Sequence, residues 1–484
     1  MKPSLFLLLF LCSFSLIAAD QRPNILFAIA DDWGFPHAGV YGDKVVKTPV
    51  FDTLGKSGII FNHAYISAPS CAPSRAAIVT GQWHWRLKEG ANLYGPIPRE
   101  NPLYTIMLDE AGYHVGMTRK GWGPGSSAGW PHNPAGKSYK NFDAFLKARP
   151  KGKPFCFWFG SHDPHRGYVK DSGAKSGIDI NAIQLPGCFP DSQEVRGDVA
   201  DYYFEVQRFD REVGEMVETI KKMGEFENTL IIITGDHGMP FPRGKSNLYD
   251  LGTRVPLVAH WPAKIKKPAS LNNFVSLIDL APTFLEAAGI KVPEIMNGQS
   301  LVPMFTPEFK SEQGRKIIIT GKERHVPVQE APNPGGYPCR SLRNHKYLLI
   351  RNFEIEWWPA GTPNYEKAFI PGGWLGDCDN GPTKSYMVDN KDKDSIHKKL
   401  YELSFGFRPE WELYDVEKDP HQLNNVAGES GYAEVLTSMK KQLMDELAKA
   451  GDPRATGETQ SFQTYPYSGG SPKFPGFKKP KAKK

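Results

Sequence analysis

The sequence predicts an α/β protein with a doubly wound sheet, and three observations support this fold class. Segments 24–32 (NILFAIADD), 154–167 (PFCFWFGSHDPHRG) and 229–238 (TLIIITGDHG) each run from an apolar stretch into polar residues. Their apolar parts are continuous rather than alternating, which is typical of strands buried on both faces of a sheet. Over 194–223, apolar residues recur every three or four positions, which predicts an amphipathic helix. Strands that alternate with helices favour the doubly wound arrangement.

The pattern changes at about residue 310, where a smaller α+β domain is expected. Three segments with the sequences RKIIIT, KYLLIRN and WELYDVEKDPHQLNN predict antiparallel strands and turns. Residues 432–450 then follow the pattern of one amphipathic helix. The predicted organisation is a large domain over 20–309, a smaller one over 310–455, and a Lys-, Pro- and Gly-rich tail over 456–484 that we expect to be disordered.

Residues 1–19 predict a signal peptide. One lysine precedes an apolar run from Leu5 to Ile17, and small residues follow before Asp20. The run is too short for a membrane span, and no later segment holds about 18 unbroken apolar residues. We therefore expect an exported protein, periplasmic or secreted, without a membrane span.

The net charge of +6 does not indicate a nucleic-acid partner. Six lysines lie within the last 14 residues, which contain no acidic residue, so the rest of the chain is close to neutral. A basic tail of this kind is typically solvated. The charge therefore gives no reason to expect nucleic-acid binding.

The cysteines are compatible with disulfides in an oxidising compartment. Of the six, Cys12 lies in the predicted signal peptide and Cys71 is the odd one out. The other four allow three pairings, among which the sequence does not choose: Cys156, Cys188, Cys339 and Cys378. An unpaired cysteine in an exported protein makes Cys71 a candidate functional residue.

Acidic residues follow two of the predicted strands. Asp31 and Asp32 end the first, and Asp236 with His237 ends the third. In a doubly wound sheet the carboxyl ends of the strands meet at one edge, where ligands bind. Clustered carboxylates repel one another unless a cation lies between them, and their oxygens favour a hard ion such as calcium or magnesium. Taken alone, such a pair of aspartates is also typical of a turn or a helix cap.

Cys71 stands at the start of a predicted helix, in the sequence CAPSR (71–75). If this helix begins at the same edge, its N-terminal amides favour a bound anion. Arg75 can then pair with the anion or hold residue 71. The alternative is an ordinary helix start with proline in its first turn.

Together these motifs resemble the formylglycine-dependent sulfatase family of the alkaline-phosphatase superfamily. The Cys-x-Pro-x-Arg core of that family is matched in full by Cys71 to Arg75. The other matching blocks, in chain order, are NILFAIADDWG, TPVFDTLGKSGIIFNHAY, AGYHVGMTRK, SHDPHRG, TGDHG…GKSNLYDLGTRVPL and WELYDVEKDPHQLNNVAG. The resemblance implies an alkaline-phosphatase-like mixed sheet, doubly wound and flanked by helices, followed by an antiparallel sheet with a helix.

The resemblance also implies site residues. Cys71 would be oxidised to formylglycine by a formylglycine-generating maturation enzyme, and a hydroxyl of its hydrate would attack the sulfur atom. His165 would protonate the leaving atom. One divalent cation, calcium in the family and magnesium as the alternative, would be held by residue 71 and by Asp31, Asp32, Asp236 and His237. The cationic groups around the sulfate or residue 71 would be Arg75, Lys120 and Lys245.

One position departs from the family pattern. The family commonly has a histidine two residues after the first active-site lysine, and Trp122 takes that place here. Either another residue substitutes, such as His162 or His84, or this enzyme handles the formylglycine hydrate differently. The candidate substrate contacts are His84, His162, Arg166, Glu323, Arg324, His325 and Arg340. Trp357 and Trp358 either stack on sugar or form a buried pair.

Within the family, the chain resembles the heparan N-sulfatase (sulfamidase) branch, on the segments FGSHDPHRG, GMPFPRGKSNLYDLGT and YPCR. The predicted function is an exported sulfatase that hydrolyses the sulfate esters, or the N-sulfate, of a sulfated polysaccharide or its oligosaccharides. Two alternatives stay open. One is a phosphate or phosphonate ester hydrolase of the same superfamily, and the other is a catalytically silent glycan-binding protein.

Overall fold

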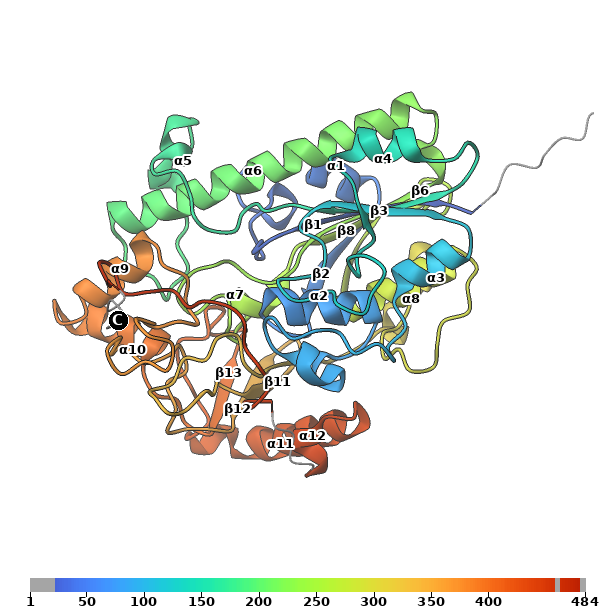
Figure 1. Ribbon diagram of the computed structural model, residues 1–484. Coiled ribbons are helices and arrows are strands. Elements are labelled where there is room, and N and C mark those ends of the chain that lie inside the picture. Colours follow the sequence, from blue (N-terminus) through green and yellow to red (C-terminus); the bar gives the residue numbers. More distant parts are fainter. Residues whose placement is uncertain (1–21, 458–461, 479–484) are drawn as a thin grey trace, which may run out of the picture.

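The computed structural model describes residues 22–457 and 462–478 (Figure 1). The predicted signal peptide, Cys12 and residues 479–484 lie outside these ranges. A search of the described ranges for a helix with the length and apolar character of a membrane span finds none.

A mixed nine-stranded sheet lies at the centre of the larger part of the molecule (Figure 1). Its central strand, β1, runs parallel to β5 on one side and to β6 on the other. β8 is antiparallel to both β6 and β2, which makes the sheet mixed toward that edge. The order is β4-β3-β5-β1-β6-β8-β2-β7, with β9 paired to β2. The strands are β1 Asn24–Ala30, β2 Ile59–Tyr65, β3 His114–Arg119, β4 Lys137–Ser138, β5 Phe155–Gly160, β6 Thr229–Gly235, β7 Arg254–Val255, β8 Leu257–His260 and β9 Ala269–Ser276.

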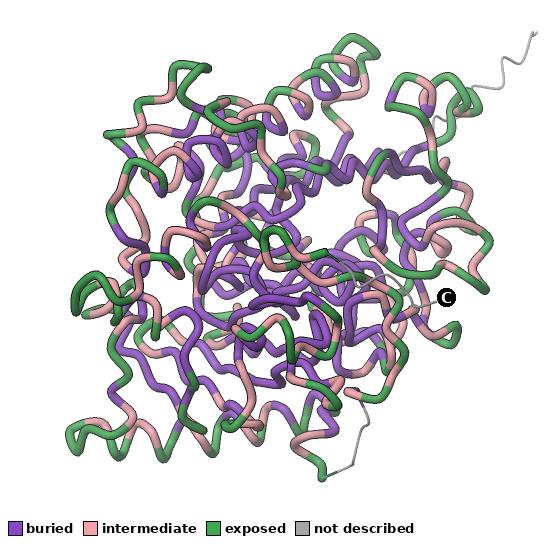
Figure 2. Tube along the Cα trace, turned by 60° about the vertical axis from the view of Figure 1, so that its left-hand side comes forward, coloured by how far each residue is buried: buried purple, intermediate pink, exposed green. Residues whose placement is uncertain are grey.

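Helices cover both faces of this sheet, which confirms the doubly wound prediction. Side chains of β1 alternate between two cores, so that Phe27 packs on one face and Leu26 on the other. The Phe27 face is covered by α2 Cys71–Thr80, α3 Tyr104–Glu110 and α8 Leu280–Ala287. The Leu26 face is covered by α1 Pro49–Lys56, α4 Phe142–Ala148 and α6 Gln193–Lys222. Figure 2 shows the buried trace gathered inside this layered arrangement.

The long helix α6 runs the length of one face of the sheet (Figure 1). It begins where the Ser192 side chain accepts a hydrogen bond from the Val195 amide, an N-cap that satisfies one otherwise unpaired donor. Its apolar residues, among them Val199 and Val206, are buried against the sheet. The helix predicted from periodicity over 194–223 is therefore confirmed.

A second, four-stranded antiparallel sheet forms the smaller part of the fold, as predicted. Leu342, Leu349 and Leu413 on its strands pack against Leu443 of the helix α11. The sheet order is β10-β11-β12-β13. Its elements are β10 Ile318–Lys322, β11 Cys339–Arg343, β12 Tyr347–Asn352, β13 Trp411–Asp415 and α11 Ala433–Lys449. The remaining α-helices are α5 Ser172–Lys175, α7 Asp250–Thr253, α9 Pro382–Asp389, α10 Ser395–Phe405 and α12 Pro453–Thr456.

One expectation differs from the structure, and one possibility that the sequence left open is not realised. The tail expected to be disordered is packed over residues 462–478, where Phe462 is 1% exposed and Lys473 pairs with Gly373 in a β-bridge. Its aromatic residues bury apolar surface. The prediction of disorder considered only the Lys-, Pro- and Gly-rich composition and not these aromatic residues. The disulfides left open by the sequence do not form among the described cysteines, because Cys71, Cys156, Cys188, Cys339 and Cys378 are all free and buried.

Candidate active site

The ends of two parallel strands and the start of one helix meet at one point of the fold. Asp31 and Asp32 directly follow β1, and Asp236 and His237 directly follow β6. The two strands are adjacent and parallel, so their carboxyl ends share an edge. Cys71 is the first residue of α2 and lies at the same edge. The convergence expected from the sequence is therefore present, and all five residues are buried.

The Cys71 sulfur faces this cluster directly. Its Sγ lies 3.3 Å from His237 Nε2, 3.7 Å from Asp31 Oδ1 and 4.0 Å from Asp32 Oδ1. Burial raises the pKa of the Cys71 thiol, and the nearby lysines only partly oppose that effect. The unmodified side chain is therefore a protonated thiol at neutral pH.

Four of these residues have the spacing of a metal site. One donor atom each from Asp31, Asp32, Cys71 and His237 lies within 4.8 Å of the others. Two carboxylates, an imidazole and an oxygen in place of the sulfur would suit a hard divalent ion. Asp236 adjoins this set, but its carboxylate accepts hydrogen bonds from the Asp32 amide at 2.9 Å and from Arg75 Nε at 2.7 Å.

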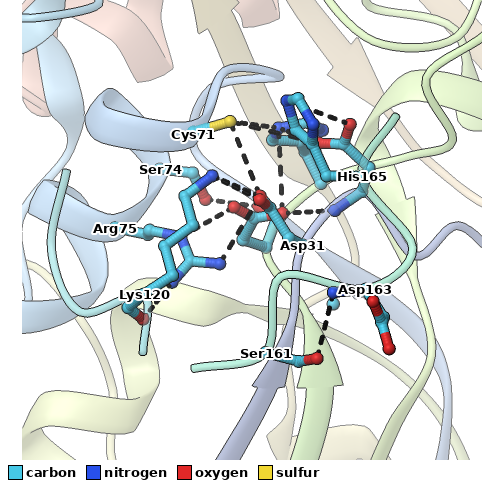
Figure 3. Close-up of polar contacts among 12 residues, drawn as sticks. Asp31, Cys71, Ser74, Arg75, Lys120, Ser161, Asp163 and His165 are labelled. Atoms are coloured by element: carbon cyan, nitrogen blue, oxygen red, sulfur yellow. Dashed lines mark hydrogen bonds and ion pairs between the residues drawn. The ribbon is translucent and has the colours of Figure 1, made fainter. Parts of the chain in front are cut away.

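Two lysines neutralise the carboxylates. Lys120 Nζ lies 2.6 and 2.5 Å from the oxygens of Asp31, and Lys245 Nζ lies 3.0 Å from Asp32 Oδ2. Burial alone would raise the pKa of Asp31, but Lys120, His165 and Arg75 outweigh it and hold that pKa well below its usual range. Asp31 is therefore ionised. Figure 3 shows Cys71, Arg75, Lys120 and His165 arranged around it.

The first turns of α2 supply two further side chains of the CAPSR sequence, Ser74 and Arg75. Ser74 Oγ donates to the Asp236 carbonyl oxygen at 2.6 Å. Arg75 is fully buried and donates through Nη1 to the carbonyl oxygens of Lys120 and Gly121, at 3.0 and 2.9 Å. Arg75 thus ties α2 both to Asp236 and to the segment that carries Lys120.

Asp379 is a residue of this site that the sequence did not reveal. Its Oδ2 lies 2.9 Å from Lys245 Nζ. It also groups with Asp32 and His165, whose Nε2 lies 3.9 Å from Asp32 Oδ2. Burial would raise the pKa of Asp379, but Lys245 and His165 lower it. It follows β12 in a long loop, and no motif marks it.

A cavity of about 920 Å³ opens beside the cluster. Of the residues predicted from the sequence, it is lined by Asp31, Cys71, Lys120, His162, His165, Arg166, Lys245 and His325. Trp122, which stands where the family commonly has histidine, also lines it, and its indole nitrogen is buried with no hydrogen-bond partner. Of the two histidines proposed to substitute for the family histidine, His162 lines the cavity and His84 does not.

Several candidate substrate contacts lie elsewhere. His84 is fully buried, with its Nδ1 2.8 Å from Ser67 Oγ. Glu323 and Arg340 are paired with each other at 2.6 Å in the interior. None of the three lines the cavity. Glu323 and Arg340 have ion-pair partners that the local sequence does not show, whereas His84 keeps one ring nitrogen buried without a hydrogen-bond partner.

Arg324, Trp357 and Trp358 also lie outside the cavity wall. Arg324 donates to backbone carbonyl oxygens of the C-terminal segment. Trp358 packs on Phe407 with ring centroids 4.2 Å apart. Arg166 lines the cavity, but its guanidinium forms a bidentate pair with Asp198 at 2.7 and 2.8 Å.

Two family models match the chain. Residues 23–290 match the family described as Sulfatase. Residues 235–355 match the domain described as N-sulphoglucosamine sulphohydrolase, C-terminal. The first match covers more than half of the chain and includes every residue of the cluster at Cys71 except Asp379.

Curated relatives match over most of their length. An ulvan-active sulfatase of Formosa agariphila is 29% identical over 90% of this chain and 82% of its own. The N-sulphoglucosamine sulphohydrolase of Homo sapiens is 27% identical over 89% of this chain and 91% of its own. The similarity thus includes both parts of the fold.

Solved structures share the fold at lower identity. A protein solved with its substrate D-glucosamine-2-N,6-O-disulfate has a TM-score of 0.63 and 20% identity, over 90% of this chain and 100% of that one. A phosphonate monoester hydrolase of Silicibacter pomeroyi has a TM-score of 0.65 and 16% identity, over 92% of this chain and 97% of that one.

Proposed function

Because the chain belongs to the sulfatase family, and is a sulfuric ester hydrolase with similarity to N-sulphoglucosamine sulphohydrolase, we propose that it removes sulfate from a sulfated glycan. Two relatives named for glycan substrates match nearly the whole chain, one for ulvan and one for N-sulphoglucosamine. The open cavity beside Cys71 has room for a saccharide. We also propose export through residues 1–19, to the periplasm or the medium.

The observation that carries this proposal is the position of residue 71. Its side chain lies within 4.0 Å of His237, Asp31 and Asp32, on the cavity wall. We propose that Cys71 is converted to formylglycine, whose hydrate supplies an oxygen nucleophile at the same place. A thiol is a poor substitute because sulfate must leave the nucleophile again in every turnover.

The surrounding residues have roles that follow from their charges. Asp31, Asp32, His237 and residue 71 would hold one divalent cation, calcium or magnesium, which when bound polarises a sulfuryl oxygen and favours an ionised nucleophile. Lys120 and Lys245 face residue 71 and bind the anionic oxygens of the sulfate. His165, half exposed at the cavity, is placed to protonate the leaving oxygen or nitrogen.

The first test compares the protein with and without conversion of Cys71. The full chain is expressed with a formylglycine-generating enzyme, and mass spectrometry of the peptide around residue 71 measures conversion. We expect converted protein to release sulfate and Cys71→Ala to release none. Cys188→Ala, a buried cysteine in the core away from the cluster, is the matched control and should retain activity. Converted protein with no sulfate release from any substrate would contradict the proposal.

The substrate panel separates the open alternatives. It contains N-sulfoglucosamine, O-sulfated ulvan oligosaccharides, a heparan sulfate oligosaccharide and a phosphonate monoester. Release from N-sulfoglucosamine assigns the sulfamidase reaction, and release only from ulvan fragments assigns O-sulfatase activity. Faster turnover of the phosphonate ester would favour the hydrolase alternative, and tight binding without turnover would favour a silent glycan-binding protein.

A further inference from the structure

The C-terminal residues 462–478, here called the strap, are anchored to the body of the protein at their first end. Asn92 Nδ2 donates to the Phe462 carbonyl oxygen at 2.6 Å. Arg324 donates to the carbonyl oxygens of Gln463 and Tyr465, both at 2.6 Å. Backbone groups of the strap are therefore held by buried side chains far away in sequence.

The far end of the strap is anchored too. The Trp374 amide donates to the Pro472 carbonyl oxygen at 3.0 Å, and the Phe474 amide donates to the Gly372 carbonyl oxygen at 2.9 Å. The Phe474 ring stacks on Tyr365 with centroids 4.1 Å apart. In Figure 1 the strap is the dark red trace that passes β11 and runs toward α9.

Between its two anchors the strap forms part of the cavity wall. Tyr467, Gly470, Ser471 and Pro472 all line the cavity that also contains Cys71. The middle of the strap thus faces the site, while its ends hold it in place.

Tyr467 forms an aromatic pair beside the reacting residue. Its ring meets that of Tyr94 edge to face, with centroids 5.3 Å apart. Both rings pack against the small apolar cluster that contains Cys71 and Ala72. Both side chains are only partly buried, so part of their surface is open to a molecule in the cavity.

The charged groups of the cavity are already paired. Five arginines and lysines line it, and each lies beside a carboxylate: Arg119, Lys120, Arg166, Arg208 and Lys245. Lys120 and Lys245 belong to the cluster at Cys71. The other three are held by Glu212, Asp198 and Asp163. Away from the reacting sulfate, these three guanidinium groups already have carboxylate partners, so the uncharged groups of the cavity wall can contribute to recognition.

We propose that Tyr467 and Tyr94 form a sugar-binding subsite, and that the strap makes the C-terminus a determinant of glycan specificity. A pyranose ring has C–H groups on its faces and hydroxyl groups around its edge. An aromatic surface suits the faces. The Ser471 hydroxyl donates to the Pro472 carbonyl oxygen at 3.3 Å, and its own oxygen can still accept a hydrogen bond from a sugar hydroxyl. This inference rests on the proposed function, since it takes the substrate to be a sulfated saccharide.

The experiment compares a saccharide with a sugar-free sulfate ester. KM and kcat are measured for wild type, Tyr467→Ala, Tyr467→Phe and Ser468→Ala, on the best oligosaccharide of the panel and on 4-nitrophenyl sulfate. We expect Tyr467→Ala to raise the ratio of the oligosaccharide KM to the aryl sulfate KM about tenfold. Tyr467→Phe keeps the ring and loses only the hydrogen bond from its hydroxyl to the Gly470 carbonyl oxygen, so the ratio should stay close to the wild-type value. Ser468→Ala, an exposed neighbour outside the cavity wall, should leave it unchanged.

A binding measurement keeps the test independent of turnover. Calorimetry gives the Kd of the same oligosaccharide for Cys71→Ala with and without the added Tyr467→Ala change, and we expect about a tenfold weaker Kd in the double variant. An unchanged Kd and KM ratio, or equal losses on both substrates, would overturn the subsite. Absence of turnover in converted wild type with intact binding would instead count against the proposed function alone.

Discussion

At the scale of single residues, three carboxylates at the strand ends, with Asp379 beside Lys245 as a fourth, face three cations. The carboxylates follow β1 and β6, and the cations come from α2 and two loops: Asp31, Asp32 and Asp236 against Arg75, Lys120 and Lys245. Every one of these side chains is largely buried, so each charge depends on its partner. If a cation neutralises the carboxylates as proposed, Lys120 and Lys245 would be free to pair with a sulfate. The same lysines would then stabilise the site without a cation and bind the substrate when a cation is present.

The role of Lys245 can be tested by substitution. We expect Lys245→Ala to lower kcat/KM for the best sulfated substrate by about 100- to 1000-fold, because a preorganised positive charge at the sulfate is lost. Steady-state kinetics of converted protein measure the effect, with exposed Lys147→Ala as the matched control. Unchanged kcat/KM in Lys245→Ala would show that this lysine only balances Asp32 and Asp379.

Glu323 is a second test at this scale, and it concerns stability. Burial raises its pKa, but Arg454 and Arg340 outweigh that effect and lower the pKa to about 2. The stabilisation by its carboxylate is therefore complete above the ordinary pKa of 4.5 and is lost as the pH falls toward 2. We expect Glu323→Gln to lower the free energy of unfolding at pH 7 by about 3 kcal/mol, because buried Arg340 keeps only Asp452 as a partner and partly buried Arg454 loses its carboxylate.

Denaturant unfolding at a series of pH values measures this difference. It should shrink as the pH falls from 4.5 to 2, because the wild-type carboxylate becomes protonated while glutamine does not titrate. Glu434→Gln, an exposed position on α11, should show almost no difference at any pH. A gap for Glu323→Gln that stays constant down to pH 2 would contradict the assignment.

At the scale of elements, α9 holds the loop that carries Asp379. Lys384 Nζ lies 2.8 Å from the carbonyl oxygens of Trp374 and Cys378, and 3.2 Å from that of Leu375. It also lies 2.8 Å from Asn380 Oδ1. The Lys384 ammonium group is thus hydrogen-bonded to four oxygen atoms of residues 374–380. These hydrogen bonds hold the segment that carries Asp379, whose carboxylate lies beside Lys245.

Lys384→Met tests this positioning. We expect the free energy of unfolding to fall by about 3 kcal/mol because buried carbonyl groups lose their donor. We also expect kcat to fall more than KM changes, since Asp379 no longer holds Lys245 in place. Lys393→Met, an exposed position that follows α9, is the control. A loss of stability with unchanged kcat would assign Lys384 a purely structural role.

At the scale of the whole molecule, the site depends on layers that are far apart in sequence. Helices on both faces bury the main sheet, and the residues that follow its strands β1 and β6 form the cluster around Cys71. The smaller sheet packs beside it, and the strap returns from the C-terminus to the cavity (Figure 1). Cation binding at the strand ends should therefore stabilise the fold as a whole.

Removal of the cation tests this coupling. We expect a chelator to abolish sulfate release and to lower Tm, because a ligand that binds only the folded state at a hundredfold excess over its Kd adds about 3 kcal/mol. Adding back calcium or magnesium, with recovery of both Tm and activity as the readouts, identifies the ion. Asp32→Asn should show a Tm that no longer responds to chelator. A wild-type Tm and activity that ignore the chelator would contradict the cation site.

Much of the fold was predictable because its signals are local. The continuous apolar runs of β1, β5 and β6 indicated a sheet buried on both faces, and the periodicity over 194–223 indicated α6. Asp31 with Asp32, and Asp236 with His237, end their strands, so parallel pairing alone brings them to one edge. Cys71 was predictable because its motif lies within five consecutive residues.

The tertiary structure decided what local patterns cannot contain. Asp379 reaches Lys245 from 134 positions away, and Tyr467 reaches Tyr94 from the far end of the chain. Glu323 and Arg340 were predicted to contact the substrate, yet they form an ion pair with each other in the interior. The physical reason is the same in each case. Periodicity and motifs depend only on residues that are close together in the chain. The position of a buried charge or ring depends on a partner from elsewhere in the chain, because that contact compensates the hydration lost on burial.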